Sequence, residues 1–472
     1  MAFIFGGPGN DTLNGGAGND TLNGFGGNDT INGKAGADRT NGGSGNDRII
    51  DDDFVNFDIH NGGTGIDTID YSNVTFSSGR VTINLNTETT SVSGGNTETI
   101  RNFENVEGSQ GGETIIGTSG ANRLDGNGGN DTINGGAGAD RTFGGSGNDT
   151  IIDDDFVNFD IHNGGSGIDT IDYSNVTFGS GQVTINLATA TTSVSGGNTE
   201  TIRNFENVEG SQGGETIIGT SGANRLDGNG GNDTINGGAG ADTIIGGIGN
   251  DTIIDDDFVN FDVHNGGSGI DTIDYSNVTF GSGFVTINLA TSTTSVSGGN
   301  TETILRFENV EGSQGGETII GTSGANRLDG NGGNDSITGA GGNDTLIGGL
   351  GSDTLNGTNS IVDGVGEIDI LDPGDFGARD LVILGTSGSI YYNGAGLDYA
   401  VIDNFDRFNF AGETDSDKIQ ISGSLSNYTL TSFTGTISGV SITNGTRINL
   451  GAEIIAYVDS SGLLTAADFI SV

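Results

Sequence analysis

A nine-residue phrase, glycine-glycine-x-glycine-x-aspartate-x-apolar-x, recurs through most of this chain and limits what it can fold into. The phrase begins at Gly6 as GGPGNDTLN, continues at Gly15 as GGAGNDTLN, and is still legible at Gly348 as GGLGSDTLN. Its first six residues suit a tight turn, because glycine accepts positive φ angles. Its last three suit a very short strand with one inward Leu or Ile. The sequence therefore predicts an all-β fold, a parallel β-roll or β-solenoid of stacked coils.

The aspartate at position six gives each turn a short, ionised carboxylate, and the glycines turn backbone carbonyls toward the same point. Calcium prefers six to eight such oxygens at about 2.3–2.6 Å. Two phrases should make one coil, so that Asp11 faces Asp29 and Asp20 faces Asp38. Such ladders of like charge would repel one another without a cation between them. We therefore predict several bound Ca2+ ions, held by Asp11, Asp20, Asp29, Asp38, Asp47, Asp67, Asp131, Asp140, Asp149, Asp169, Asp233, Asp242, Asp251, Asp271, Asp335, Asp344 and Asp353.

The composition agrees with a fold that needs a counter-ion. The chain has 472 residues, of which 92 are glycine and only 31% are hydrophobic, and its formal net charge is -48. Such numbers normally predict disorder, but a disordered chain needs no fixed spacing of Gly, Asp and Leu. The two observations together suggest a chain that is disordered without its cation and folded with it.

The same composition excludes several partners. Nucleic acid and anionic membrane surfaces are not expected, because both are bound by clustered Lys and Arg. The chain has no cysteine, so disulfides and thiolate metal sites are excluded. No apolar run is long enough to span a membrane, so no membrane span is predicted.

A second, longer period divides the chain into units. The phrase IIDDDFVNFD begins at Ile49, Ile151 and Ile253, a spacing of 102 residues. The units are predicted at 1–112, 113–214 and 215–316, followed by a partial unit at 317–357 and a β-rich C-terminal region at 358–472.

Each long unit contains an insert between its nonapeptide runs. In the stretch 71–107, apolar residues alternate at Val81, Ile83 and Leu85, which is typical of strands. We expect a solenoid whose calcium-rich segments are joined by such strand-forming inserts. In the C-terminal region, strand patterns occur at 380–385, 398–405 and 417–423.

Position six departs from aspartate in two phrases of each later unit. The departures are Glu113, Glu215, Glu317, Asn122, Asn224 and Asn326. Glutamate is longer and asparagine is neutral, so calcium should bind there weakly or not at all. Thr40 and Thr142 occupy the apolar position eight, which should loosen the packing locally.

Histidines, acidic runs and phenylalanines are expected to have ordinary structural roles. His60, His162 and His264 lie one per unit, and a zinc site needs several converging ligands, so exposed positions or positions lining a turn are expected. The runs Asp51–Asp53, Asp153–Asp155 and Asp255–Asp257 lack a glycine turn and favour solvated loops over an extra cation site. Phe54, Phe57 and Phe103 should pack where the nonapeptide is interrupted, with carbohydrate stacking as the alternative.

The phrases GGAGNDTLN, GGSGNDTII and GGIGNDTII resemble the RTX, or haemolysin-type, calcium-binding nonapeptide of bacterial secreted proteins. The resemblance covers residues 6–70 and recurs to Gly357. It implies a calcium-dependent, right-handed parallel β-roll and export by a type I secretion apparatus, with an uncleaved C-terminal signal. The tail phrases DYAVIDNF, DKIQISGSLSNYTL and LTAADFISV are similar to the C-terminal regions of cyanobacterial RTX proteins.

These observations favour a secreted or cell-surface calcium-binding protein with a structural role, and not an enzyme. The motifs H-E-x-x-H and G-x-S-x-G are absent, and because the repeats begin at Gly6, no catalytic domain is expected ahead of them. Cell-surface polysaccharide stays open as a further partner. The alternatives are an enzyme, such as a hydrolase or polysaccharide epimerase, with a site in 358–472, and an adhesin or haemolysin-type toxin.

Overall fold

The architecture comes from a computed structural model. It describes residues 1–52, 54, 56–75, 81–154, 156, 158–177, 183–256, 258, 260–278, 285–358, 366–374, 378–392, 398–406, 416–460 and 462–472. Within these residues the regular structure is β-strand throughout, apart from two short 3-10 helices, η1 (Leu425–Asn427) and η2 (Ala466–Asp468). The chain divides into two compact units, Met1–Gly231 and Asn232–Val472, which we describe separately.

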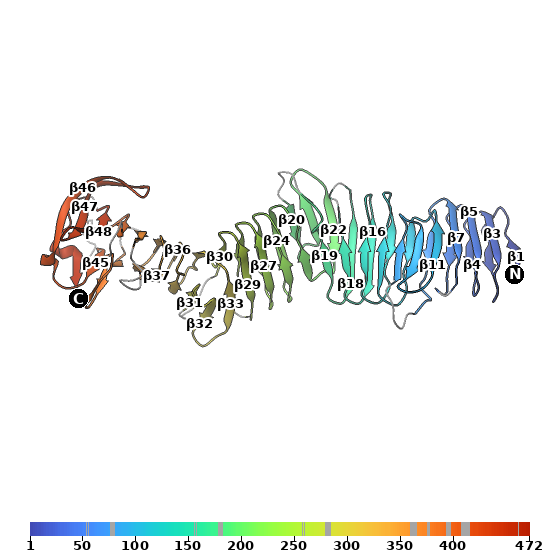
Figure 1. Ribbon diagram of the computed structural model, residues 1–472, viewed down its shortest axis with the longest axis horizontal. Helices are drawn as coiled ribbons and strands as arrows, with labels where there is room; N and C mark the ends of the chain where they lie inside the picture. The colour runs from blue at the N-terminus through green and yellow to red at the C-terminus, as the bar shows by residue number, and fades with distance from the viewer. Residues whose placement is uncertain are drawn as a thin grey trace. The chain divides into compact units, whose positions relative to one another are not determined.

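The strands of the first unit lie side by side in two sheets, as Figure 1 shows from β1 onward. One sheet has the order β1 (Phe3–Phe5), β3 (Thr21–Gly26), β5 (Arg39–Ser44), β7 (Ile59–Thr64), β11 (Thr97–Arg101), β10 (Thr89–Val92), β9 (Val81–Asn84), β13 (Glu113–Ile116), β15 (Thr132–Asn134), β17 (Thr150–Ile152), β19 (Thr170–Asp172), β23 (Asn207–Glu209) and β25 (Arg225–Asp227). The other has the order β2 (Thr12–Asn14), β4 (Thr30–Asn32), β6 (Arg48–Ile50), β8 (Thr68–Asp70), β12 (Asn105–Glu107), β14 (Arg123–Asp125), β16 (Arg141–Ser146), β18 (Ile161–Ser166), β22 (Thr199–Arg203), β21 (Thr191–Val194), β20 (Val183–Asn186) and β24 (Glu215–Thr220).

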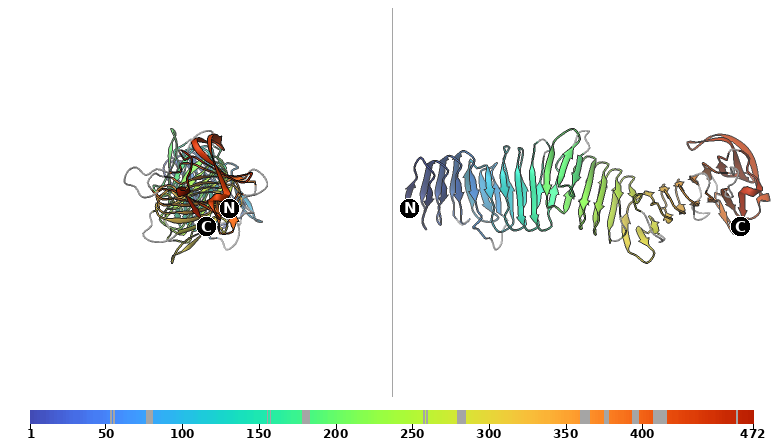
Figure 2. Two further views of the ribbon diagram at one scale, coloured as in Figure 1. Left: turned by 90° about the vertical axis from the view of Figure 1, so that its left-hand side faces the viewer. Right: turned by 180° about the vertical axis from the view of Figure 1, so that it is seen from behind.

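The second unit has the same two-sheet construction (Figure 2). One run of paired strands is β27 (Thr243–Ile248), β29 (Val263–Ser268), β33 (Thr301–Leu305), β32 (Thr293–Val296), β31 (Val285–Asn288), β35 (Glu317–Ile320), β37 (Ser336–Ala340), β39 (Thr354–Thr358), β41 (Leu381–Ile383), β45 (Lys418–Ile421) and β49 (Phe469–Ser471). The other is β26 (Thr234–Gly238), β28 (Thr252–Ile254), β30 (Thr272–Asp274), β34 (Asn309–Glu311), β36 (Arg327–Asp329), β38 (Thr345–Ile347), β40 (Ile368–Asp372), β44 (Tyr399–Ile402), β48 (Glu453–Val458), β47 (Val440–Leu450) and β46 (Tyr428–Ile437). The strands β42 (Gly385–Thr386) and β43 (Ser389–Ile390) form a separate hairpin.

Two phrases make one coil, as predicted. Thr12 in β2 lies beside Thr30 in β4 with parallel register, and Thr30 lies beside Arg48 in β6. The residue at position eight points inward in every such strand, so that Leu13, Ile31, Ile49 and Ile69 form one stacked column in the core. Burying each of these side chains contributes about 1.5–3 kcal/mol. The fold is the right-handed parallel β-roll that the sequence predicts.

Glycine at position four is required by close approach of the coils. Gly147 has a φ of 130°, and a Cβ there would collide with the carbonyl oxygen of Gly129 in the preceding coil. Any other residue would be strained by this φ and would also push the coils apart.

The insert of each long repeat is a three-stranded antiparallel meander spliced into the parallel stack. In the first copy β11 runs parallel to β7, β10 runs antiparallel to β11 and β9, and β9 runs parallel to β13. The opposite sheet passes the insert without interruption, because β8 pairs with β12 and β12 with β14. The roll is therefore continuous through 81–107.

Consecutive inserts lie in opposite sheets of the first unit. The β9–β11 meander belongs to the sheet of β1, whereas its sequence copy β20–β22 belongs to the sheet of β2. One long repeat contains an odd number of half-coils, so that Glu113 begins β13 in one sheet and its counterpart Glu215 begins β24 in the other.

The C-terminal region continues the stack rather than starting a new fold. The three predicted strand patterns become β41, β44 and β45, which pair in parallel with β39, β40 and β41. The long antiparallel hairpin β46–β47 then packs through Ile442 on Val401 and Tyr457.

The phenylalanines expected to pack where the nonapeptide is interrupted differ in burial. Phe54 and Phe103 are buried as expected, and Phe54 stacks on Tyr71 with ring centroids 4.7 Å apart. Phe57, however, is 65% exposed, so its predicted packing role is wrong. The next residue, Asp58, is buried and accepts from the N–H of Asp38, so the adjacent side chain of Phe57 faces outward.

Candidate metal centres

The position-six aspartates form ladders along the edges of the roll, in the pairing predicted from the phrase. The backbone N–H of Asp29 donates to Oδ1 of Asp47 at 2.7 Å, and the N–H of Asp47 donates to Oδ1 of Asp67 at 2.7 Å. This bond recurs from coil to coil, because the aspartate directly precedes each strand. One carboxylate oxygen of each residue is thus held by the neighbouring backbone.

All the predicted site residues occupy these ladders. In the first unit the ladders hold Asp11, Asp29, Asp47 and Asp67; Asp20 and Asp38; Asp131, Asp149 and Asp169; and Asp140. In the second unit they hold Asp233, Asp251 and Asp271; Asp242; Asp335 and Asp353; and Asp344.

The second carboxylate oxygen of most ladder aspartates is buried and has no hydrogen-bond partner among the described residues. These atoms are Oδ2 of Asp29, Asp38, Asp47, Asp67, Asp131, Asp149, Asp169, Asp251, Asp271, Asp335 and Asp344. A buried, unpaired carboxylate oxygen costs several kcal/mol unless a cation compensates it. The repetition of this feature from coil to coil indicates ligands for a cation rather than isolated defects.

The glycine at position one leaves the space that a cation would need. A Cβ on Gly330 would lie 2.5 Å from Oδ2 of Asp335 and 2.6 Å from the carbonyl oxygen of Gly348 in the next coil. The two oxygens thus border the same space beside the glycine, and an all-oxygen donor set suits calcium. The residues therefore fit the ion, with a carboxylate and a backbone carbonyl from successive coils as ligands.

Burial raises the pKa of the ladder carboxyls. The pKa of Asp335 rises to about 8, first through burial and then through the neighbouring carboxylates of Glu317 and Asp353. The pKa of Asp131 likewise rises to about 8 and that of Asp67 to about 6, both mainly through burial. In the absence of a cation, the folded ladder thus takes up protons.

In the first copy of these phrases, the side chains that depart from aspartate are hydrogen-bonded within the protein. In the glutamate phrase, the hydroxyl and N–H of Ser109 donate to the carboxylate of Glu113. In the asparagine phrase, Nδ2 of Asn122 donates to the carbonyl oxygen of Glu104 at 2.7 Å, and Oδ1 accepts from the N–H of Thr118. The amide thus bridges the coils as a cation would. This geometry supports the expectation of weak or absent calcium binding, which stays a prediction.

Sequence reasoning missed several ladder residues because they lack the glycine turn. Asp58 accepts from the N–H of Asp38 at 2.5 Å, and Asp369 and Asp380 accept from the N–H groups of Asp344 and Asp353 at 2.9 and 2.7 Å. Asp160, Asp262 and Asp417 hold equivalent places. The signal that could have found some of them is the second half of the phrase alone, an aspartate followed by x and an apolar residue, as in Asp380-Leu381-Val382.

The three histidines are buried, so the expectation of exposed or turn positions is wrong. His60 points into the core from β7, where its Nε2 lies 3.1 Å from Oδ2 of Asp51 and its Nδ1 lies 2.8 Å from the hydroxyl of Thr40. Asp51 and Asp58 are buried beside it, and the ligand atoms of all three residues lie within 4.8 Å of one another. The clusters of Asp153, Asp160 and His162 and of Asp255, Asp262 and His264 repeat this arrangement.

The same clusters revise two further expectations. The first aspartate of each acidic run is buried rather than part of a solvated loop, whereas Asp52 is partly exposed and pairs with Lys34. Asp53, Asp155 and Asp257 lie outside the described residues. Thr40 does not loosen the packing, since it is buried and bonded to His60.

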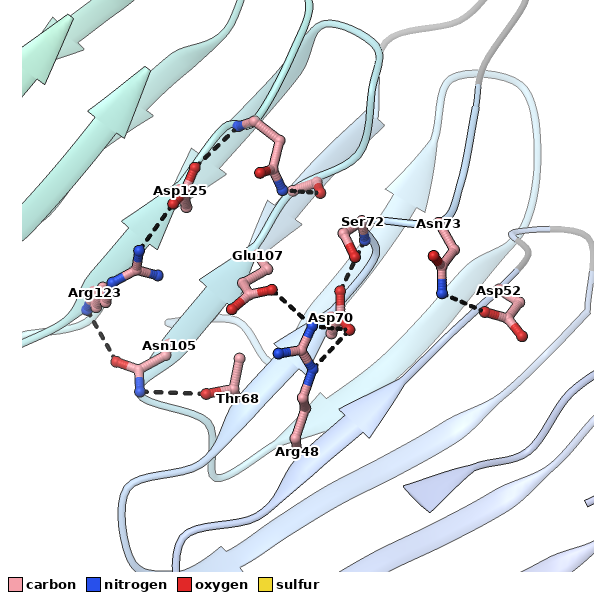
Figure 3. A network of polar contacts seen from close by, with 12 residues as sticks. Arg48, Asp52, Thr68, Asp70, Ser72, Asn73, Asn105, Glu107, Arg123 and Asp125 are labelled. Carbon is pink, nitrogen blue, oxygen red and sulfur yellow. Dashed lines mark hydrogen bonds and ion pairs between the residues drawn. The ribbon is translucent and has the colours of Figure 1, made fainter. Parts of the chain in front are cut away.

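Arginines brace the acidic outer face of the roll, as Figure 3 shows for the first insert. Arg48 in β6 contacts Asp70 in β8 at 2.6 Å and Glu107 in β12 at 2.9 Å, and so ties three successive coils. Arg123 pairs with Asp125 at 2.9 Å within β14. These partly exposed pairs contribute little individually, but they lower the repulsion between acidic coils.

The chain matches the family described as RTX calcium-binding nonapeptide repeat (4 copies), over residues 5–40, 33–53, 107–141, 116–151, 209–244, 218–253, 311–346 and 320–355. These segments are the nonapeptide runs that build the ladders. The chain therefore contains several copies of the RTX calcium-binding nonapeptide repeat.

Solved structures add little beyond this family. The crystal structure of the extracellular lipase LipA from Serratia marcescens is similar at 17% identity over 54% of this chain and 40% of the lipase chain, with a TM-score of 0.17. No curated protein sequence matches the chain significantly. Within the described residues, no helix has the length and hydropathy needed to cross a bilayer.

Filling the space at position one should abolish local calcium binding while keeping every carboxylate. Gly330→Ala places a methyl group between Oδ2 of Asp335 and the Gly348 carbonyl, so we expect at least one calcium fewer per chain by isothermal titration calorimetry. The matched control is Gly324→Ala, whose Cβ would meet no atom nearer than the Thr322 hydroxyl at 3.7 Å. Equal calcium binding by the two variants would contradict this assignment of the ligands.

The raised pKa values predict that acid partly replaces calcium. Asp335 titrates near 3.8 when unfolded and at about 8 when folded, so its stabilisation of the calcium-free fold is complete below the lower value and is lost as pH rises through the upper one. The calcium-free chain should therefore have more β-structure at about pH 5.5 than at about pH 8.5. Far-ultraviolet circular dichroism of calcium-depleted protein tests this, and a larger β-signal at the alkaline pH would refute it.

Proposed function

We propose that this protein is an extracellular structural element that folds when calcium binds after export. The observation that carries the proposal is the row of buried carboxylate oxygens without partners. In a chain with net charge -48, these oxygens make the folded state unfavourable where calcium is scarce. Calcium that binds only the folded chain shifts the equilibrium by mass action, by about 2.7 kcal/mol per site at a hundredfold excess over Kd.

The proposed role is structural or surface-associated and not catalytic. Support comes from the C-terminal region, where an enzyme would have to hold its site under the alternative hypothesis. Its described strands β41, β44 and β45 extend the same stack, and its aspartates Asp369 and Asp380 extend the same ladders. These carboxylates lie in a cation-binding register between coils. Cell-surface polysaccharide is proposed as a further partner, because the repeats present the same outer surface many times.

Calcium-dependent folding can be measured directly on the full chain. We expect a disordered far-ultraviolet circular dichroism spectrum in excess chelator and a β-rich spectrum at millimolar calcium, with a matching fall in hydrodynamic radius. Magnesium at the same concentration is the control, and it should be much less effective because it requires stricter octahedral geometry. A chain equally folded in chelator and in calcium would overturn the proposal.

Export by a type I apparatus is the second part of the proposal, with the signal in 358–472. The final strand β49 pairs with β45 and is preceded by η2, which places the terminus as the last layer of the stack. Deleting 463–472 should abolish appearance of the chain in the medium of a host carrying the apparatus, without lowering its amount inside the cell. The control is Asp125→Asn on the outer face. Undiminished secretion of the truncated chain would contradict a C-terminal signal.

A further inference from the structure

A buried cluster of mixed chemistry lies in each long repeat, and it shares one aspartate with the ladders (Asp58, Asp160 or Asp262). In the first copy, Asp51 follows β6, Asp58 precedes β7, and His60 occupies the inward column of β7 between Thr40 and Ile100. All three ligating residues are at least 97% buried, since the most exposed of them has a relative accessibility of 3%. The position that should hold an apolar side chain thus holds an imidazole that faces two carboxylates.

A third carboxylate increases the charge of this cluster. The register of β11 against β7 places Glu98 beside Asp58, and Glu98 is buried as well. The Tyr71 hydroxyl is under the electrostatic influence of Glu98, Asp51 and Asp58 together. Three carboxylates and one imidazole thus lie together in the core. A bound cation would stabilise the ionised form of such buried carboxylates.

The hydrogen bond at the far side of the imidazole orients it as a ligand. When Nδ1–H donates to the Thr40 hydroxyl, Nε2 carries a lone pair directed at Asp51, 3.1 Å away. Two lone pairs at this distance repel unless a cation or a proton lies at the site. Adjacent ligands of tetrahedral zinc, bound at about 2.0–2.2 Å, are about 3.3–3.5 Å apart, which is close to the observed separation.

The third copy offers a natural contrast. Ile244 replaces the threonine beside His264, and Nδ1 of His264 has no partner among the described residues, although the side chain is 98% buried with a relative accessibility of 2%. Its Nε2 keeps the contact with Asp255 at 3.2 Å. The histidine–carboxylate pair is therefore retained where the orienting hydroxyl is absent, which points to the pair itself as the feature that matters.

We propose that each long repeat holds one transition-metal ion, of the Zn2+ class, between the imidazole and the two aspartates of this cluster. In chain order the sites comprise Asp51, Asp58 and His60; Asp153, Asp160 and His162; and Asp255, Asp262 and His264. Calcium takes oxygen ligands, whereas an imidazole nitrogen selects zinc and related ions. The sites thus differ from the rest of the ladders in having a nitrogen ligand, and each lies where the last strand of a meander pairs with the parallel stack.

Zinc titration of the full chain in saturating calcium tests the proposal by isothermal calorimetry. The wild type should bind three zinc ions, His60→Gln two, and the triple variant His60→Gln, His162→Gln, His264→Gln none. Cobalt should give the visible absorption of a low-symmetry site with nitrogen ligation, and this absorption should vanish in the triple variant. Asp125→Asn, on the outer face, is the control and should bind zinc as the wild type does. Unchanged circular dichroism in calcium shows that each variant is folded.

The threonine contrast gives a second readout that does not depend on removing a ligand. Thr40→Val should weaken the first site by about 10–100-fold, and Ile244→Thr should strengthen the third by a similar factor, because a partner on Nδ1 orients the ligand. No zinc uptake by the wild type would overturn the proposal and leave a plain histidine–aspartate hydrogen bond. Uptake that survives the triple variant, or that millimolar calcium abolishes, would overturn it equally.

Discussion

The stacking of aspartate carboxylates, coil upon coil, is the constraint on which the structure depends. Each carboxylate is divided between two tasks: Oδ1 accepts the N–H of the preceding coil, and Oδ2 faces the space above a glycine that carries no side chain. The first task sets the register of the sheets. The exposure of Oδ2 to this space makes the ionised carboxylate unfavourable without a cation, because burial and the neighbouring carboxylates both oppose ionisation. A chain with 31% hydrophobic residues can use this arrangement in place of a large core, with one column of inward residues, mainly Leu and Ile, from each sheet.

The roll tolerates interruption because its two sheets are interrupted separately. Where β9–β11 enters one sheet, β8, β12 and β14 carry the parallel stack past it in the other. The odd number of half-coils in a long repeat then moves the next insert, β20–β22, to the opposite sheet. No sheet of the first unit has two consecutive inserts. Arg48 contacts Asp70 and Glu107 on the outer face of the same coils. These ion pairs therefore link the strands of the uninterrupted sheet where the other sheet holds the meander.

Much of this could be predicted from the sequence, because the nonapeptide is a local rule: turn, ligand and inward residue all lie within nine positions. The coil, the ladder pairing and the apolar column follow directly. The remainder depends on register across long loops. Asp58, Asp369 and Asp380 enter the ladders from segments without glycine turns, at offsets of 20, 25 and 27 residues instead of 18. His60 appeared isolated, since its partners Asp51 and Thr40 reach it only when the link after β6 folds back. Phe57, directly before the buried Asp58, gave no local sign that it would point outward.

The asparagine and glutamate phrases differ from the aspartate phrases in how their side chains are hydrogen-bonded. In Asn122 the amide nitrogen supplies the positive pole that a cation supplies elsewhere, and it reaches the Glu104 carbonyl of the neighbouring coil. The carboxylate of Glu113 is taken by Ser109. In this copy the two side chains are thus paired without any ion. We therefore expect the free-energy cost of removing calcium to be concentrated in the aspartate coils, such as those of Asp131, Asp149 and Asp169. We also expect the calcium-dependent segments to be bounded by coils such as that of Asn122 rather than by the ends of the sequence repeats.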